Sequence, residues 1–230
     1  MIRRYYATKD NTITNAFEEN LTTRGTGSNM GASDILETFS IYNQVSNSSG
    51  ISSELARTLI EFDTTEISSA RSSGDIPASG SVSFYLKMYN APHSQTVPRN
   101  YTLSVQGVSG SWQEGYGIDM DFYEDLTRDG IGSNWIRRSG STSWSSQGGD
   151  FYTDASSSFT QDFTTGLEDL CVDVTTLVEQ WLDSAGNVLG SKDNNGFVIK
   201  FTNALETTSR SFFTKKFFGR DSEFFFQRPV

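Results

Sequence analysis

Short segments in which apolar and polar residues alternate recur along the whole chain. Residues 36–42 read at a period of two, and residues 57–63 carry apolar residues on one face of an extended segment. A period of two is typical of half-buried strands, so both segments are predicted to be strands. The same reasoning predicts further strands at residues 12–14, 82–89, 101–108, 197–201, 212–218 and 223–227.

One segment has helical rather than strand periodicity. Within residues 173–182, five apolar positions fall on one stripe at helical spacing: Val174, Leu177, Val178, Trp181 and Leu182. Asp173 is the expected N-cap, and Gly186 follows soon after the end. We expect this helix to lie across the sheet with Trp181 as its anchor, whereas residues 68–80, rich in Ser and Gly, are expected to be a connection.

The order of these elements indicates the fold class. Strands follow one another with turn signals between them and without βαβ alternation, which favours a sandwich or jelly roll. We therefore predict an all-β fold, a jelly-roll-like β-sandwich with one short helix docked near its C-terminal end, as a single domain over residues 1–230. The 17 Phe and 9 Tyr residues are expected to supply an aromatic core.

Residues 109–165 form the longest segment without a clear pattern, and it contains three of the four tryptophans, Trp112, Trp135 and Trp144. These rings have two interpretations. They either form a platform on which a sugar stacks or make a small core that holds the loops down. We prefer the small core and keep the glycan contact as the alternative.

Charge and composition exclude several classes of function. The net charge is −10 and the 18 Lys and Arg residues are scattered, so binding to nucleic acid or to an anionic membrane is not expected. No run approaches the ~20 apolar residues of a membrane span. The single cysteine, Cys171, excludes an internal disulfide, and its apolar neighbours predict a buried thiol. With one Cys and one His, a zinc site cannot be built from these residues alone.

The acidic residues suggest two kinds of site, neither of which the pattern favours. One loop gathers Asp119, Asp121, Glu124, Asp125 and Asp129. Calcium is a minority hypothesis for this loop, because the EF-hand spacing is absent. Glu114 with Asp119 or Asp121 is conceivable as a glycosidase pair, but nothing in the sequence indicates a raised pKa. The one histidine, His93, lies in a proline-bounded loop without a nucleophile motif. We therefore expect neither enzymatic activity nor a cofactor.

Aromatic residues crowd the last part of the chain and place apolar side chains on both faces of the final predicted strands. One face belongs to the core, and the other needs a cover, for which a neighbouring subunit is the natural candidate. The residues of this expected assembly surface are Phe212, Phe213, Phe217, Phe218, Phe224, Phe225 and Phe226.

The order of motifs resembles the DNRLRE-type domains, which are β-sandwich modules of bacterial surface proteins and phage proteins. The similarity is spread over most of the chain. The residues that carry it are Ala7, Asp10 and Ile13, then Asn29, Gly31 and Leu36, then residues 57–63, 111–115 and 172–181, and finally Asn195, Gly196 and Phe197. A narrower likeness, to structural proteins of tailed phages of marine cyanobacteria, is carried by residues 22–34, 148–150 and 213–223.

This resemblance implies a structural protein located in the virion. We expect the particle-anchoring domain of an appendage or a decoration protein, with other virion proteins and further copies of itself as partners. In proteins of this kind the chain continues past the equivalent of residue 230, so a longer protein is expected. The alternative is a carbohydrate-binding module for a host surface glycan, and a glycosidase is the third possibility.

Overall fold

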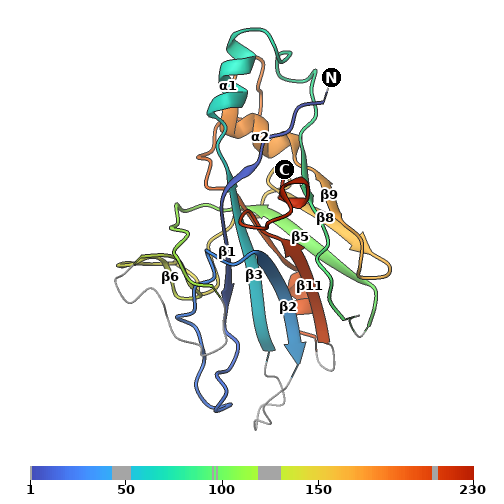
Figure 1. Cartoon of the computed structure of the whole chain (residues 1–230). Coiled ribbons are helices and arrows are strands. Elements are labelled where there is room, and N and C mark those ends of the chain that lie inside the picture. The colour runs from blue at the N-terminus through green and yellow to red at the C-terminus, as the bar shows by residue number, and fades with distance from the viewer. Residues whose placement is uncertain (1, 43–52, 95, 97, 119–130, 209–211) are drawn as a thin grey trace.

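Antiparallel strands make up most of the regular structure of the protein (Figure 1). The computed structural model describes residues 2–42, 53–94, 96, 98–118, 131–208 and 212–230. Among these residues, seven strands form one sheet in the order β11-β2-β3-β10-β5-β8, with β1 paired to β3. The strands are β1 (Ala7–Thr14), β2 (Ile35–Tyr42), β3 (Ser53–Phe62), β5 (Tyr101–Gly107), β8 (Ser158–Phe163), β10 (Phe197–Phe201) and β11 (Phe212–Phe218).

In the described residues, two small antiparallel pairs and four short helical segments make up the rest of the regular structure. The pairs are β4 (Tyr85–Met88) with β9 (Leu170–Asp173) and β6 (Arg137–Ser139) with β7 (Thr142–Ser143). The helical segments are α1 (Thr65–Ser72), α2 (Thr175–Leu182), α3 (Asn203–Glu206) and the 3₁₀ turn η1 (Phe225–Gln227). Helices α1 and α2 lie at the same end of the molecule as both termini (Figure 1).

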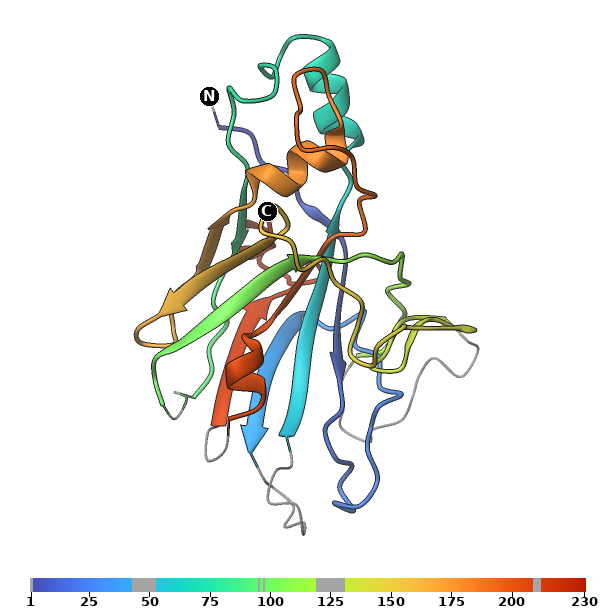
Figure 2. The ribbon, with the colours of Figure 1, turned by 180° about the vertical axis from the view of Figure 1, so that it is seen from behind.

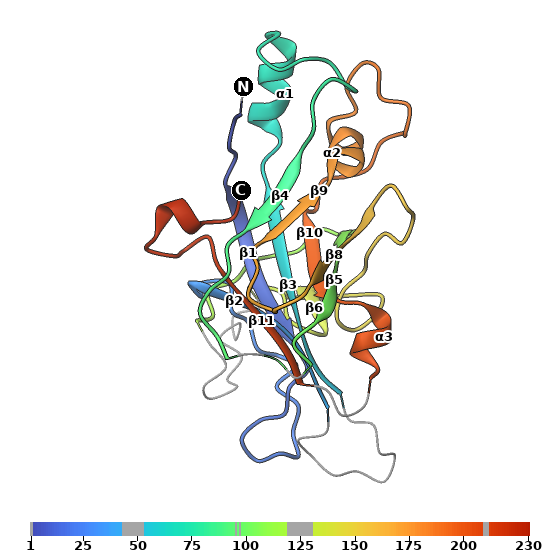
Figure 3. The same ribbon diagram turned by 90° about the vertical axis from the view of Figure 1, so that its right-hand side faces the viewer.

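Strand β3 is the point at which the sheet curls into two layers. It pairs with β1 along residues 56–62, with β2 along 53–56 and with β10 along 58–60. A strand has only two edges, so β2 and β10 follow one another along the edge opposite β1. One layer therefore contains β1, β2 and β11 and the other contains β10, β5 and β8, as the side view shows (Figure 3).

The β4–β9 pair closes the gap between the layers. On one side the Gln161 side chain bridges β8 to β9: its Nε2 donates to the Asp169 carbonyl (2.8 Å) and its Oε1 accepts from the Cys171 N–H (2.7 Å). On the other side the Phe218 N–H donates to the Tyr89 carbonyl (3.1 Å), which joins β11 to the end of the β4 segment. The result is an all-β, sandwich-like fold, as predicted.

The main core lies between the layers and is largely aromatic. Tyr101 stacks on Phe163 and Phe201 stacks on Phe213, with ring centroids 5.1 and 5.4 Å apart. Helix α2 covers one end through Leu177 and Val178, both buried. The predicted helix is therefore confirmed, and the Trp181 ring lies 4.7 Å from that of Phe197.

The ends of two predicted elements differ from the structure. Helix α2 begins at Thr175 with Val174 as its N-cap, so Asp173 is not the cap itself. Its carboxylate instead accepts the Thr175 N–H (3.0 Å) from just outside the helix. In β9, Leu170 and Val172 face the core while Cys171 is exposed, so the predicted burial of the thiol is wrong: strand alternation turns it outward.

Three further segments were assigned the wrong type of structure. The connection expected at residues 68–80 contains most of α1, which folds because Ile67 and Ala70 pack with Ile76 in a separate small cluster. The strand expected at 223–227 is a 3₁₀ turn, in which the Gln227 N–H donates to the Phe224 carbonyl (2.8 Å). Strand β8 lies within the region 109–165 that has no clear sequence pattern, because its edge position requires few apolar residues.

Candidate functional site

The three tryptophans of the loop region are buried, each 4–5% exposed. They form a second core on the outer face of β1, β3 and β10, together with Ile13, Leu59, Val108 and Val198. Two indole N–H groups are also satisfied internally: Trp112 donates to the Asn195 carbonyl and Trp144 to the Asn134 carbonyl, both at 2.9 Å. None of the three therefore offers an exposed ring face on which a sugar can stack.

This second core explains why the loops pack against the sheet. Because side chains alternate along a strand, Phe197 and Ile199 of β10 point into the main core while Val198 points outward. The loops around the three tryptophans lie beside β1 and β3, on the side away from β8 and β9 (Figure 2), and cover this outward face. The tryptophan loops thus act as a third layer of the fold.

A buried ion network fastens this layer to the sheet. Arg57 of β3 binds Glu206 of α3 with two hydrogen bonds of 2.7 and 2.9 Å and also donates to the Gly148 carbonyl (2.7 Å). Lys200 of β10 lies 3.6 Å from the same carboxylate, and burial lowers the pKa of this lysine. Every member of the network is held by groups of the chain itself, which indicates a structural role.

A second polar network joins three distant parts of the chain at the free edge of β1. Asp10 is fully buried; its Oδ2 accepts the Arg220 backbone N–H (2.5 Å) and its own N–H donates to Glu114 Oε1 (2.8 Å). The Arg220 Nε also lies 3.1 Å from Glu114 Oε1. Burial raises the pKa of Asp10 to about 7 and also raises that of Glu114.

The backbone around this network is packed too closely to leave room for a substrate. Asn29 donates to the Glu114 carbonyl (2.6 Å) and accepts the Gly117 N–H (2.9 Å). A Cβ at Gly117 would lie 1.6 Å from the Asn29 carbonyl oxygen, and one at Gly31 would lie 2.3 Å from that of Glu114. Glu114 therefore acts here as a connector of chain segments rather than as a solvent-facing acid.

We predict that replacing Asp10 by asparagine changes how stability depends on pH. Between pH 3.8 and about 7 the unfolded chain releases a proton that folded Asp10 keeps. Stability therefore falls as the pH rises through this window, by up to about 1.4 kcal/mol per pH unit. The amide of the D10N variant retains an acceptor for Arg220 and stays neutral, so this variant should unfold at higher urea concentration than the wild type at pH 8.

The gain of D10N at pH 8 should be on the order of 1–2 kcal/mol, because the new amide N–H groups also lose water. At pH 4, where the wild-type carboxyl is itself neutral, the two proteins should differ much less. The pKa of Glu114 is also raised, so the free energy of unfolding keeps some dependence on pH in both proteins. Equal pH profiles for the two proteins would contradict the raised pKa of Asp10.

The predicted phenylalanine surface divides between core and solvent. Phe213 and Phe217 are buried in the main core, whereas Phe212 is half exposed at the opposite end of β11 from Phe218. Phe224, Phe225 and Phe226 are 44, 56 and 65% exposed. We call Tyr6, Phe218, Phe224, Phe225 and Phe226 the C-terminal aromatic surface.

The members of this surface contact one another in two groups of rings. Phe225 lies 4.6 Å from Tyr6 between ring centroids, Phe224 lies 6.0 Å from Phe218, and Phe226 lies 6.2 Å from Phe224. The backbone turn η1 projects from the molecule next to β1 (Figure 3). The arrangement presents several large apolar side chains together, which suits contact with another protein.

A lysine occupies the core face of β11, between two buried phenylalanines. Lys215 is fully buried between Phe213 and Phe217, and its Nζ donates to Asn90 Oδ1 (2.6 Å) and to the Gly166 and Glu168 carbonyls (3.2 and 2.5 Å). Burial lowers its pKa to about 8. The chain encloses this amine, so it stabilises the packing of β11 rather than meeting a substrate.

The remaining predicted groups give no site among the residues that the structure describes. The calcium hypothesis at residues 119–129, and the pairing of Glu114 with Asp119 or Asp121, lie outside the described residues. Within the described part of the chain, no three His, Cys, Asp or Glu side chains gather in a way that could hold a metal ion. His93 is half-buried, with Nδ1 2.7 Å from the Ser94 carbonyl oxygen.

Comparison with known proteins adds no assignment to these observations. No helix in the described ranges is long and apolar enough to cross a membrane. No protein-family model matches the chain, and no curated protein matches it at a significant level.

Proposed function

We propose that this chain is a structural protein of a bacteriophage particle, which acts by protein–protein assembly and without catalytic turnover. The proposal of assembly is supported by the C-terminal aromatic surface, in which three consecutive phenylalanines are exposed. The phage part rests on the resemblance of the sequence to structural proteins of tailed phages.

The physical argument for assembly is the cost of exposed aromatic area. Each large apolar side chain that leaves water on binding contributes about 25 cal/mol per Å² of buried surface. Aromatic residues are also enriched at the centres of protein interfaces, where few residues supply most of the affinity. Phe224, Phe225 and Phe226 have the residue type and the exposure of such anchors.

A further copy of the same chain is the partner we favour first, with other virion proteins as additional partners. Structural proteins of particles act in many copies, and a surface used by every copy gives symmetric contacts. The carbohydrate-binding alternative is less well supported, since Trp112, Trp135 and Trp144 are buried. A glycan array tests it directly, because a purely structural chain binds none of the sugars.

Replacing Phe225 and Phe226 by serine is predicted to weaken self-association. Removal of two central aromatic anchors should cost about 2 kcal/mol or more each, so the dissociation constant should rise on the order of 1,000-fold or more. Sedimentation equilibrium over a range of concentrations measures this. Both side chains are largely exposed, so the thermal stability of the monomer should stay within about 0.5 kcal/mol.

The matched control is Phe212→Ser, which removes a half-exposed phenylalanine at the opposite end of β11. Its association should equal that of the wild type. A wild-type chain that stays monomeric at high concentration would refute self-assembly through this surface, and so would equal association of wild type and F225S/F226S.

A further inference from the structure

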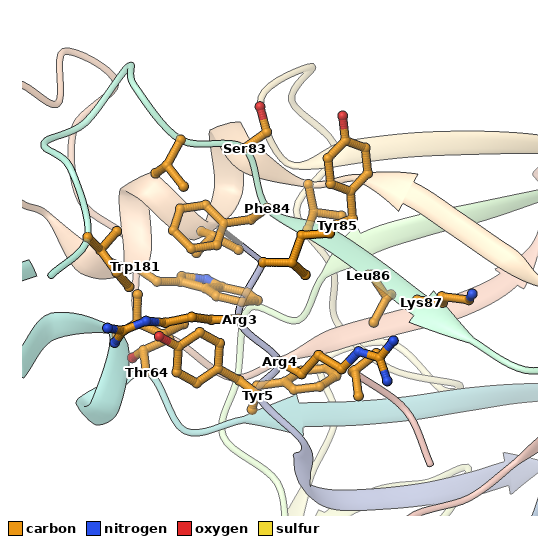
Figure 4. A pocket seen from close by; sticks show the side chains of 18 of the residues that line it. Arg3, Arg4, Tyr5, Thr64, Ser83, Phe84, Tyr85, Leu86, Lys87 and Trp181 are labelled. Atoms are coloured by element: carbon orange, nitrogen blue, oxygen red, sulfur yellow. The ribbon is translucent and has the colours of Figure 1, made fainter. Parts of the chain in front are cut away.

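A pocket of about 550 Å³ lies at the end of the molecule that carries α1 and α2 (Figure 4). Its walls come from the N-terminal segment 2–5, the residues around α1, strand β4 and helix α2. Most of the lining is apolar and includes Ile76, Phe84, Val178 and Phe197. The volume falls in the range of about 300–1,000 Å³ that is typical of small-molecule sites.

Two residues of the wall carry polar atoms that lack hydrogen-bond partners. Tyr5 Oη and Trp181 Nε1 are both shielded from solvent and bond to nothing within the described residues. Figure 4 shows Tyr5, Phe84 and Trp181 grouped in the pocket. Buried polar groups are usually paired, and an indole N–H can only donate. Because both atoms are closed to a water-sized probe, they lie within the packed wall and do not face the open part of the pocket.

The charge around the pocket is opposite to that of the whole protein. The charged side chains in its lining are Arg3, Arg4, Lys87 and Asp75, three positive against one negative, although the chain carries a net charge of −10. Arg3 and Asp75 lie 3.7 Å apart with side chains 38 and 60% exposed, so this pair contributes little. Arg4 and Lys87 have no ion-pair partner in the described ranges, which leaves positive charge for an anionic ligand.

A peptide strand from another subunit fits the pocket less well than a small molecule. Strand β4, which forms one wall, has no free edge at Lys87. One edge pairs with β9, and the backbone of Lys87 also exchanges two hydrogen bonds with Val230, of 2.7 and 3.0 Å. Addition of a strand needs unpaired backbone groups, and these are already satisfied here.

We propose that this pocket binds a small amphiphilic carboxylate, a molecule with an aliphatic body and one carboxylate group. The aliphatic body contacts Ile76, Phe84 and Val178. The carboxylate lies toward the N-terminal segment, where Arg3 and Arg4 supply positive charge. The ligand thus matches both the apolar wall and the positive charge beside it. This site is separate from the C-terminal aromatic surface.

Isothermal titration of the full chain with decanoate tests the proposal, and 1-decanol serves as the neutral probe of the same chain length. Decanoate should bind at one site and at least tenfold more tightly than decanol, because a hydrogen bond to a charged group contributes about 1.5–3 kcal/mol. The variant R3Q/R4Q should lose at least tenfold in affinity for decanoate and keep its affinity for decanol.

Two variants show where any binding occurs. Phe212→Ser should bind decanoate like the wild type, and thermal melts of every variant verify that it is folded. No heat with decanoate overturns the proposal, as does equal affinity for decanoate and decanol. Binding that survives in R3Q/R4Q but disappears in F225S/F226S would also overturn it, since the ligand would then lie on the C-terminal aromatic surface. The self-association of the chain is a separate measurement, so the two proposals fail independently.

Discussion

Replacing Arg57 by alanine is expected to destabilise the protein by about 3–5 kcal/mol, the usual cost of breaking a buried ion pair by removing one partner. Glu206 is 7% exposed at its side chain and loses both short hydrogen bonds in R57A. Lys200, 3.6 Å away, is then its nearest positive charge. Urea unfolding at neutral pH measures the loss.

The arginine also links the tryptophan loops to the sheet, which adds to the effect. Its guanidinium lies 4.9 Å from the Trp135 ring centroid and 5.6 Å from that of Phe151, and it holds the Gly148 carbonyl. The variant R57K keeps the charge but cannot bind Glu206 through two parallel N–H groups. It should lose less stability than R57A, and it gives a folded protein to measure if R57A does not fold.

A second ion pair on the same sheet provides the matched control. Lys9 of β1 and Glu61 of β3 lie 2.7 Å apart, but the lysine side chain is 39% exposed. Replacing Lys9 by methionine should therefore change stability by no more than about 1 kcal/mol. The triple variant R57M/K200M/E206M removes all three charges of the network and should be more stable than R57A. If R57A and K9M lower the free energy of unfolding by the same amount, the buried network at Glu206 stabilises the protein no more than an exposed ion pair does.

Much of the sheet can be predicted from the local pattern, because a strand with one face on the core has alternating apolar and polar residues. Residues 57–63 and 197–201 were predicted on this basis and coincide with most of β3 and with β10. The same rule places Lys215 on the core face with Phe213 and Phe217, two positions away on either side. That signal was present in the sequence, but the density of phenylalanines on both faces obscured it.

Helix α1 could not be predicted from its own residues. The segment is polar and rich in serine, and only Ile67 and Ala70 face the interior. Its position depends on a contact more than a hundred residues away, where Arg71 binds Glu179 of α2 through hydrogen bonds of 2.6 and 2.9 Å. Such a helix is stabilised by tertiary contacts rather than by propensity.

The polar network at β1 escaped prediction for the same physical reason. Asp10 and Arg220 are separated by 210 positions in sequence, and Glu114 lies between them. Neither the local pattern around Asp10 nor that around Glu114 indicates that these two residues lie in contact. Pairing of distant polar residues depends on the closed fold, which local periodicity does not describe. The pocket around Tyr5 and Trp181 could not be predicted for the same reason, because its walls come from segments far apart in the sequence.

Replacing Trp135 by alanine is the other change with a large expected effect. Removal of a buried Trp or Phe typically costs about 3–5 kcal/mol, because the side chain leaves a cavity that the surroundings fill only in part. Trp135 is 5% exposed and packs so closely that a Cβ at Gly148 would lie 2.7 Å from its ring. Its backbone N–H also binds the Thr26 carbonyl (3.2 Å), so the loss should spread to the loop before β2.

The matched control is Tyr116→Ala, which removes an aromatic ring from the same loop region that is 72% exposed. This variant should stay within about 0.5 kcal/mol of the wild type in a thermal melt. Trp135→Phe keeps part of the packing, so its loss of stability should lie between those of Trp135→Ala and Tyr116→Ala. The comparison separates a structural tryptophan from a ligand-binding one, because a sugar platform would lose binding in W135A without losing stability.

Arg57 and Trp135 touch, so their effects should not add. A single substitution of either residue loosens the same loop layer, and the second then removes contacts that are already weakened. The double variant R57A/W135A should therefore lose less stability than the sum of the single losses, by about 0.5–3 kcal/mol, the usual coupling between contacting residues. Urea unfolding of the four proteins gives this coupling, and W135F replaces W135A if the double variant does not fold. Strict additivity would mean that the ring and the guanidinium stabilise the loop layer independently, against the 4.9 Å contact between them.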